Sequence, residues 1–145
     1  MKKSLLTLLA LLGASLLVAT GCGGDDSSEE SAPTKADYIA QADDICAADQ
    51  EEIQTAAADV SGDPDDPATQ EVVTNDVLPI YQDQLDELRA LTPPEGDEEA
   101  TGGIYDALEE ALAAIEEDPA AIGDPTTFAD ANEQAVDYGL EVCGA

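Results

Sequence analysis

Residues 85–100, LDELRALTPPEGDEEA, contain the clearest helix break in this chain. Leu85 and Leu88 lie one turn apart on an amphipathic segment, which residues 92–96 cannot continue because they include two prolines and a glycine. The three acidic residues at 97–99 then place negative charge where the positive end of a new helix is expected. The stretch therefore predicts two helices joined by a short connector.

Helical periodicity extends upstream of this break. A first segment begins at Thr34 and Asp37, which have the spacing of a capping box with Asp in place of the usual Glu. Its apolar residues recur seven apart: Ile39, Cys46, Ile53 and Val60. A second segment starts at Pro67, a residue suited to the first turn of a helix, and continues to about Leu91. Pro79 lies inside it, so this segment either kinks or consists of two shorter helices.

Two more helical segments follow the break. The third continues to about Ile115, and glycines at 102–103 weaken its first turns, so it begins either at the acidic residues or nearer Ile104. The fourth is expected to begin at Asp124 as N-cap, with Pro125 at the first helical position. Four amphipathic segments with short connections predict an all-α fold, a small up-down bundle of about four helices.

The predicted helical domain occupies residues 34–145. Residues 22–33 are acidic and contain no large apolar side chain, so we expect them to form a flexible tether. Residues 1–21 contain two lysines and then an apolar run from Leu5 to Ala19. That run is shorter than the ~20 residues needed to span a bilayer, which is typical of a cleaved export signal.

The end of this signal, LVATGC at residues 17–22, resembles the lipobox of bacterial lipoproteins. In that family the cysteine receives a diacylglyceryl group and becomes the first residue of the mature chain, although Ala19 stands where leucine is most frequent. The resemblance implies a lipid anchor at Cys22 that holds the protein on the cell membrane, outside the cytoplasm. The alternative is an ordinary signal peptide that is cut nearby and leaves Cys22 free.

Three cysteines are an odd number for an exported protein. With Cys22 assigned to lipid, Cys46 and Cys143 remain to form a disulfide between the first and last helices. An antiparallel pairing of these helices through that bridge sets Gly139 beside Gln50. The bridge would close a loop of about a hundred residues, which is worth ~4 to 5 kcal/mol in the chain-entropy model.

The charge of the chain is strongly one-sided, with 34 Asp and Glu against four Lys and Arg. Removal of residues 1–21 would leave Lys35 and Arg89 as the only cations, which excludes nucleic acid as a partner because phosphate must be neutralised by Lys and Arg. Basic proteins, peptides or cations fit this charge best. Adaptation to high salt and a generally acidic secreted proteome both explain the acidity.

Candidate sites for chemistry are few. The chain has no His, and its two mature-domain cysteines are expected to be oxidised, so we predict no catalytic residue and no enzyme activity. A carboxylate-dependent hydrolase is the least favoured alternative, and no cofactor is expected. A weak candidate Ca²⁺ loop contains Asp63, Asp65, Asp66 and Glu71, but its spacing departs from the EF-hand pattern and a solvated turn is the preferred interpretation.

Two further features leave alternatives open. Arg89 belongs either to a recognition loop or to a rigid connector. The tyrosines lie on or beside the apolar stripes, and they either pack at the core edge with hydroxyls in water or surround a ligand pocket. These residues are Tyr38, Tyr81, Tyr105 and Tyr138.

Three stretches carry a wider resemblance: ADYIAQADDICAADQ at 36–50, the opening stretch at 85–100, and DYGLEVCG at 137–144. They are similar to small, Ala-rich predicted lipoproteins of actinobacteria, a group without an established activity. The resemblance supports the pairing of Cys46 with Cys143 and carries over no catalytic residue. We therefore expect a lipid-anchored binding or structural module at the cell envelope, or alternatively a small-ligand carrier with an apolar pocket inside the bundle.

Overall fold

The computed structural model describes residues 32–58 and 62–145, and both ranges are free of strands. The signal peptide, Cys22, most of the tether and Val60 lie outside the described residues. The elements, in chain order, are α1 (Lys35–Ala56), α2 (Pro67–Val72), the π-helix η1 (Val73–Val77), α3 (Leu78–Ala90), α4 (Glu98–Glu117), the 3-10 helix η2 (Pro119–Gly123) and α5 (Ala129–Tyr138). The predicted all-α fold is confirmed.

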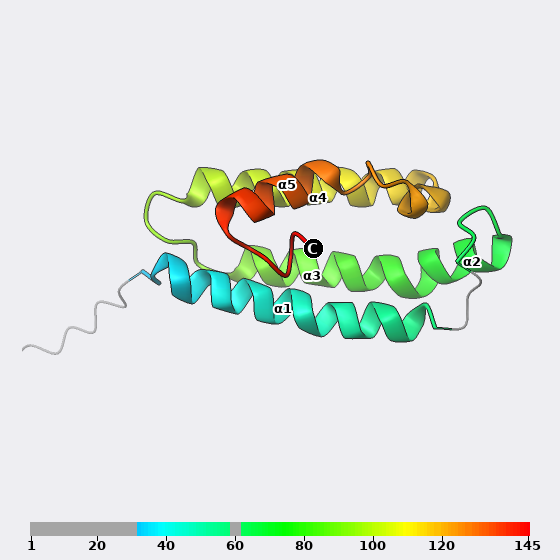
Figure 1. Ribbon diagram of the computed structural model, residues 1–145, viewed down its shortest axis with the longest axis horizontal. Coiled ribbons are helices and arrows are strands. Elements are labelled where there is room, and N and C mark those ends of the chain that lie inside the picture. The colour runs from blue at the N-terminus through cyan, green and yellow to red at the C-terminus, as the bar shows by residue number, and fades with distance from the viewer. Residues whose placement is uncertain (1–31, 59–61) are drawn as a thin grey trace, which may run out of the picture.

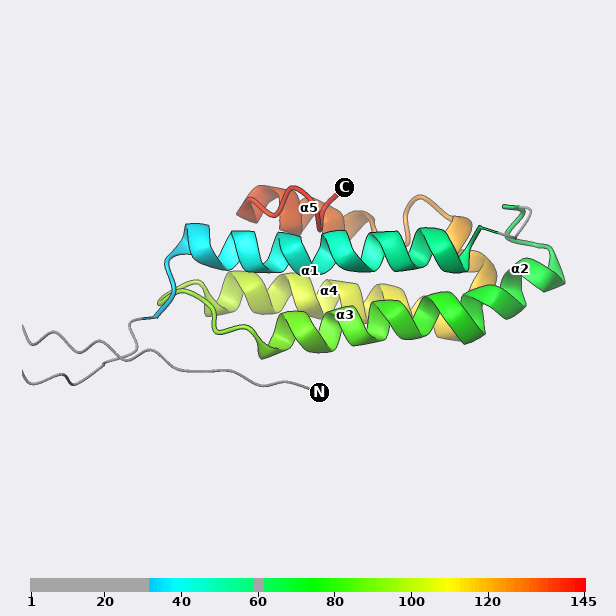
Figure 2. The same cartoon turned by 90° about the horizontal axis from the view of Figure 1, so that it is seen from below.

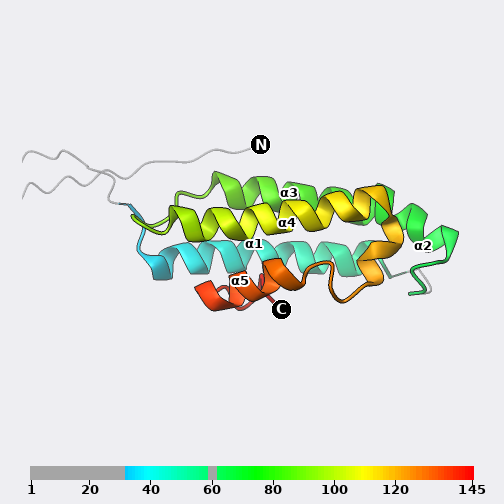
Figure 3. The same ribbon diagram turned by 90° about the horizontal axis from the view of Figure 1, so that it is seen from above.

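The helices form the expected up-down bundle (Figure 1). In Figure 1 α1 runs from left to right, α2 and α3 return, α4 runs to the right again, and α5 returns. α4 packs against both α3 and α5, and α3 packs against α1 (Figure 3). No helix in the described ranges is long and apolar enough to cross a bilayer.

The start of α1 follows the predicted capping pattern. The Thr34 hydroxyl oxygen accepts a hydrogen bond from the backbone N–H of Asp37 at 3.2 Å. The same hydroxyl donates to the Asp37 carboxylate at 2.6 Å. The Asp37 side chain therefore pairs with the capping hydroxyl, whereas the longer Glu of a full capping box reaches the backbone.

The segment that contains Pro79 is one continuous path, in which η1 joins α2 to α3 (Figure 2). Pro67 lies in the first turn, as predicted, and the structure shows Asp66 as the N-cap. Within η1 the Leu78 N–H donates to the Val73 carbonyl, five residues back. In a regular α-helix the Pro79 ring would crowd the carbonyl four residues earlier. The widened turn immediately before Pro79 accommodates the proline ring. The helical path therefore continues through Pro79 and does not divide into two separate helices.

The third helix begins at the acidic residues, and the alternative start near Ile104 is wrong. α4 starts at Glu98, and the Thr101 hydroxyl donates to the Asp97 carbonyl within its first turn. Gly103 has a packing role in this turn, because a Cβ atom there would lie 2.9 Å from the Gln134 side-chain oxygen of α5. The glycine thus leaves room for the end of the Gln134 side chain.

The predicted start of the fourth helix is also wrong. The Asp124 carboxylate accepts hydrogen bonds from the N–H and hydroxyl of Thr126, but these close only a local turn. The Thr127 hydroxyl donates back to the Ala121 carbonyl at 2.6 Å, which holds the turn against η2. α5 consequently begins at Ala129.

Candidate functional site

The C-terminal tail, residues 140–145, begins where Gly139 ends α5. Gly139 has a φ of 111°, in the left-handed region that favours glycine. Its N–H donates to the Val136 carbonyl, and the Leu140 N–H donates to the Ala135 carbonyl. These two bonds form a Schellman motif, which reverses the chain and directs the tail back along α1. Leu140 is completely buried.

Several bonds attach the tail to α1. The predicted Cys46–Cys143 disulfide is confirmed, with a Cα–Cα distance of 5.2 Å. The Asp43 carboxylate accepts the backbone N–H groups of Val142 at 3.0 Å and of Cys143 at 3.3 Å. The Gln50 amide donates to the Val142 carbonyl at 3.1 Å. We call this tail, residues 140–145, the strap, because it ties the end of α5 to α1.

The helix register predicted from this disulfide is wrong, although the disulfide itself is right. Gly139 does not lie beside Gln50, because a Cβ atom at Gly139 would contact Ile39 Cδ1 at 3.2 Å. Tyr138 and Tyr38 pack edge to face with their ring centroids 5.9 Å apart. Cys143 lies outside α5, so the bridge joins α1 to the reversed tail and sets no helix-to-helix register.

Beneath the strap lies a partly enclosed cavity of about 120 Å³. Its wall comes from α1, α3, α4, the residues around α5 and the strap itself. The lining residues are Cys46, Gln50, Ile53, Tyr81, Gln84, Leu88, Ile104, Tyr105, Leu108, Phe128, Ala131, Asn132, Ala135, Leu140, Cys143 and Ala145. They include Cys46, Ile53 and Leu88 from the predicted apolar faces, so these faces meet around a space that side chains do not fill.

The polar part of the wall consists of amides and phenols. Tyr81 and Phe128 lie with ring centroids 5.3 Å apart. Burial raises the pKa of the Tyr81 hydroxyl. Gln84 is 7% exposed and is the most buried polar side chain of the wall. All of these groups are uncharged near neutral pH.

Asp49 adjoins this wall through Gln84. Burial raises the pKa of the Asp49 carboxyl, a hydrogen bond with Gln84 lowers it, and the nearby negative charges of Glu87, Glu52 and Asp83 raise it further. One Asp49 oxygen is buried and has no hydrogen-bond partner. Asp49 itself is not a lining residue.

The tyrosines divide between the cavity and one end of the bundle. Tyr81 and Tyr105 line the cavity. Tyr38 is 1% exposed, and its hydroxyl bonds the Tyr105 hydroxyl, so it does not reach water. Burial and this bond raise the pKa of Tyr105. The Tyr138 hydroxyl donates to the Asp97 carboxylate at 2.8 Å. Neither alternative therefore describes all four tyrosines, because two of them line the cavity and Tyr38 is buried away from water.

The candidate Ca²⁺ loop uses its carboxylates locally. Asp63 accepts the N–H of Asp65 at 3.1 Å, and Asp66 accepts the N–H of Ala68 at 2.8 Å as the cap of α2. Glu71 lies exposed on α2. Across the described residues, no group of three or more acidic, His or Cys side chains is arranged to hold a metal ion. A hydrogen-bonded turn accounts for the loop.

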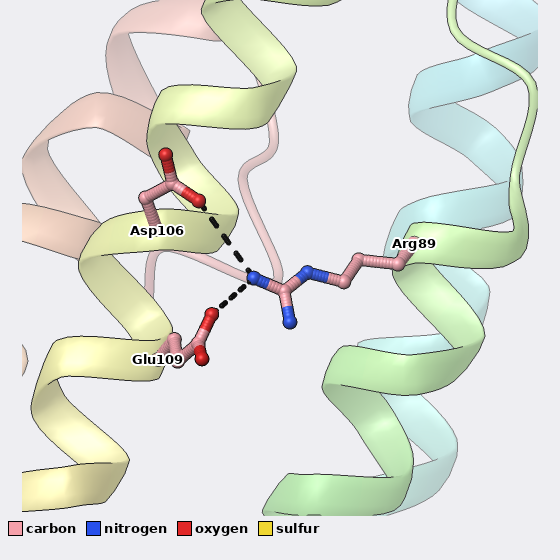
Figure 4. Close-up of polar contacts among 3 residues, drawn as sticks. All are labelled: Arg89, Asp106 and Glu109. Atoms are coloured by element: carbon pink, nitrogen blue, oxygen red, sulfur yellow. Dashed lines mark hydrogen bonds and ion pairs between the residues drawn. The ribbon is translucent and has the colours of Figure 1, made fainter.

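Arg89 ties α3 to α4 (Figure 4). Its guanidinium lies 3.7 Å from the Asp106 carboxylate and also donates to Glu109. All three side chains are exposed, so the pairs add little stability, of the order of 0–1 kcal/mol. Arg89 therefore lies in the last turn of α3, and its ion pairs link α3 to α4.

Comparison with known proteins adds no analogy for this site, since no protein-family model, curated protein sequence or solved structure matches the chain. The cavity must be interpreted from its own residues. Sequence patterns missed its polar members, because Gln84 and Asn132 carry no motif and lie among many other polar helix residues. The small residues Ala131 and Ala135 on one face of α5 were the available signal of incomplete filling.

Proposed function

We propose that this protein is a membrane-anchored extracytoplasmic lipoprotein whose helical domain binds a small molecule in the cavity beneath the strap. The lipid at Cys22 would hold the protein on the membrane, and the acidic tether would space the domain from the headgroups. This part of the proposal is supported by the N-terminal sequence. Binding at the core is supported by one structural observation, the cavity.

The cavity favours binding over catalysis. Its sulfur atoms are oxidised in the Cys46–Cys143 disulfide, so neither is available as a nucleophile. Its titratable side chains are Tyr81 and Tyr105, whose pKa values are raised by burial. The wall therefore offers shape and neutral hydrogen-bonding groups, which suit a ligand better than a reaction.

Xenon binding tests whether this space accepts a guest, since small apolar cavities in proteins take up xenon. We expect saturable NMR shifts at the lining residues of the mature domain. The substitution Ala131→Leu adds volume to the wall and should abolish the shifts. The same substitution at Ala114, which is exposed on α4, should preserve them. Absence of saturable binding in the wild type, or full binding in folded Ala131→Leu, would reject the proposal.

A further inference from the structure

We infer that the cavity takes a small, neutral molecule with one hydrogen-bonding group, such as an alcohol or a primary amide, held by Tyr81 and Asn132. This inference rests on the proposed function, because it requires that the cavity bind a ligand. It adds the charge, the size and the recognition group of that ligand.

The absence of charge on the guest follows from the side chains that line the cavity. Charged residues make up 26% of the chain, yet none of the lining side chains belongs to Asp, Glu, Lys or Arg. An ionic group inside would lose its hydration, and no lining side chain would give it an ion-pair partner, so its burial carries a large cost. Asp49 has an unpaired oxygen but stands outside the lining. The negative charge of the protein acts on ions at its surface, whereas the cavity favours an uncharged guest.

The recognition group follows from which polar side chains are already occupied. Gln50 donates to the Val142 carbonyl, and Tyr105 bonds Tyr38. The Gln84 amide interacts with the Asp49 carboxyl, whose pKa it lowers. The Tyr81 hydroxyl and the Asn132 amide make no hydrogen bond to any part of the chain that the structure describes. Both line the cavity, from α3 and α5 respectively. A guest that both donates and accepts could form hydrogen bonds with both groups, and a pure hydrocarbon could form none.

The size of the guest follows from the volume of the cavity. A cavity of roughly 150 Å³ accommodates benzene. At about 120 Å³ this cavity has room for a guest of about five to six non-hydrogen atoms. Ligands of that size bind weakly, so the measurement must cover millimolar concentrations.

Three probes of equal size separate these claims: cyclopentanol, methylcyclopentane and the cyclopentylammonium ion. Each would be titrated into the mature domain at pH 7 while the NMR shifts of Ala131, Ala135 and Leu108 are followed. We expect cyclopentanol to bind within about tenfold of methylcyclopentane, despite its much better hydration in water, because the wall replaces the hydrogen bonds of its hydroxyl. The ammonium ion should bind at least about a hundredfold more weakly at these residues.

Removal of a single hydroxyl assigns the contact. Tyr81→Phe should weaken cyclopentanol about tenfold, equivalent to 1.4 kcal/mol, and leave methylcyclopentane unchanged. Tyr138→Phe is the matched control, since its hydroxyl bonds Asp97 and does not line the cavity, and it should alter neither affinity. Thermal melts of both variants would show that they are folded.

The possible failures are distinguishable. If no probe binds, the proposed function fails together with this inference. If methylcyclopentane binds but cyclopentanol is far weaker and insensitive to Tyr81→Phe, the cavity function stands and the polar recognition is overturned. Cavity binding of the ammonium ion as tight as that of the alcohol would overturn the neutral ligand class.

Discussion

Gly139 shows how one residue redirects the end of the chain. Without a Cβ atom it adopts a φ of 111°, and the Schellman motif that it allows terminates α5 after Tyr138. The buried Leu140 then anchors the first residue of the strap. The site depends on this reversal, because a helix that continued to Cys143 would leave the cavity without its cover.

Two alanine substitutions test this role. Gly139→Ala should lower the free energy of unfolding by about 1–2 kcal/mol, because an L-residue is strained at this φ and its Cβ would press on Ile39. Gly102→Ala is the matched control, since it lies within α4 with open space around the added Cβ, and it should stabilise the protein by about 0.5–1 kcal/mol. Urea unfolding of both variants gives the comparison. Equal effects at the two sites would mean that the reversal is unimportant.

At the scale of elements, the strap is more informative than any helix. It has no regular structure of its own, and it is held by the disulfide, by Asp43 and by Gln50. Cys46 is 2% exposed, whereas Cys143 is only half-buried, so a reducing thiol has easier access at Cys143. Loss of the bridge should free the strap before the helices.

Cys143→Ser tests the contribution of the bridge. The disulfide spans 97 residues, and its removal should lower the free energy of unfolding by about 2–5 kcal/mol. Amide hydrogen exchange at Val142 and at position 143 should also accelerate more than exchange within α4. Cys22→Ser in the full chain is the control and should change neither quantity. Unchanged stability of Cys143→Ser would show that the strap is held without the bridge.

For the whole molecule, charge opposes compaction. The chain has 34 acidic residues, and the described domain has Lys35 and Arg89 as cations. Arg89 pairs with α4, and the Lys35 ammonium lies 3.8 Å from the centroid of the Tyr138 ring. These contacts leave most carboxylates on the surface without a counter-charge, so salt should strengthen the fold.

Thermal melts provide the test. The midpoint should be higher in 2 M than in 0.1 M NaCl at pH 7, because screening weakens the repulsion between carboxylates. At pH 2.5 most carboxylates are protonated, so the difference between the two salt concentrations should shrink. An identical midpoint at both salt concentrations at pH 7 contradicts this account. A salt effect of equal size at both pH values would assign it to the strengthening of apolar burial instead.

Local sequence rules predicted much of the fold and little of the site. They worked where the signal lies within one turn, as in the Thr34 cap, the Pro67 start and the break at 92–96. They failed at Asp124, whose cap serves a turn held by the contact between Thr127 and Ala121. They also failed for the register between the first and last helices, because Gly139 reverses the chain and α5 ends before Cys143.

The amino-acid sequence by itself determined the helical class and the up-down order, because periodicity and helix breakers act locally. The pairing of Cys46 with Cys143 was an expectation that followed from assigning Cys22 to lipid. Only the tertiary structure decided where α5 ends, how the strap is attached to α1 and which side chains surround the cavity. Those features depend on contacts between residues as distant as Asp43 and Val142. A space that side chains leave empty is a property of their packing, which no single segment specifies.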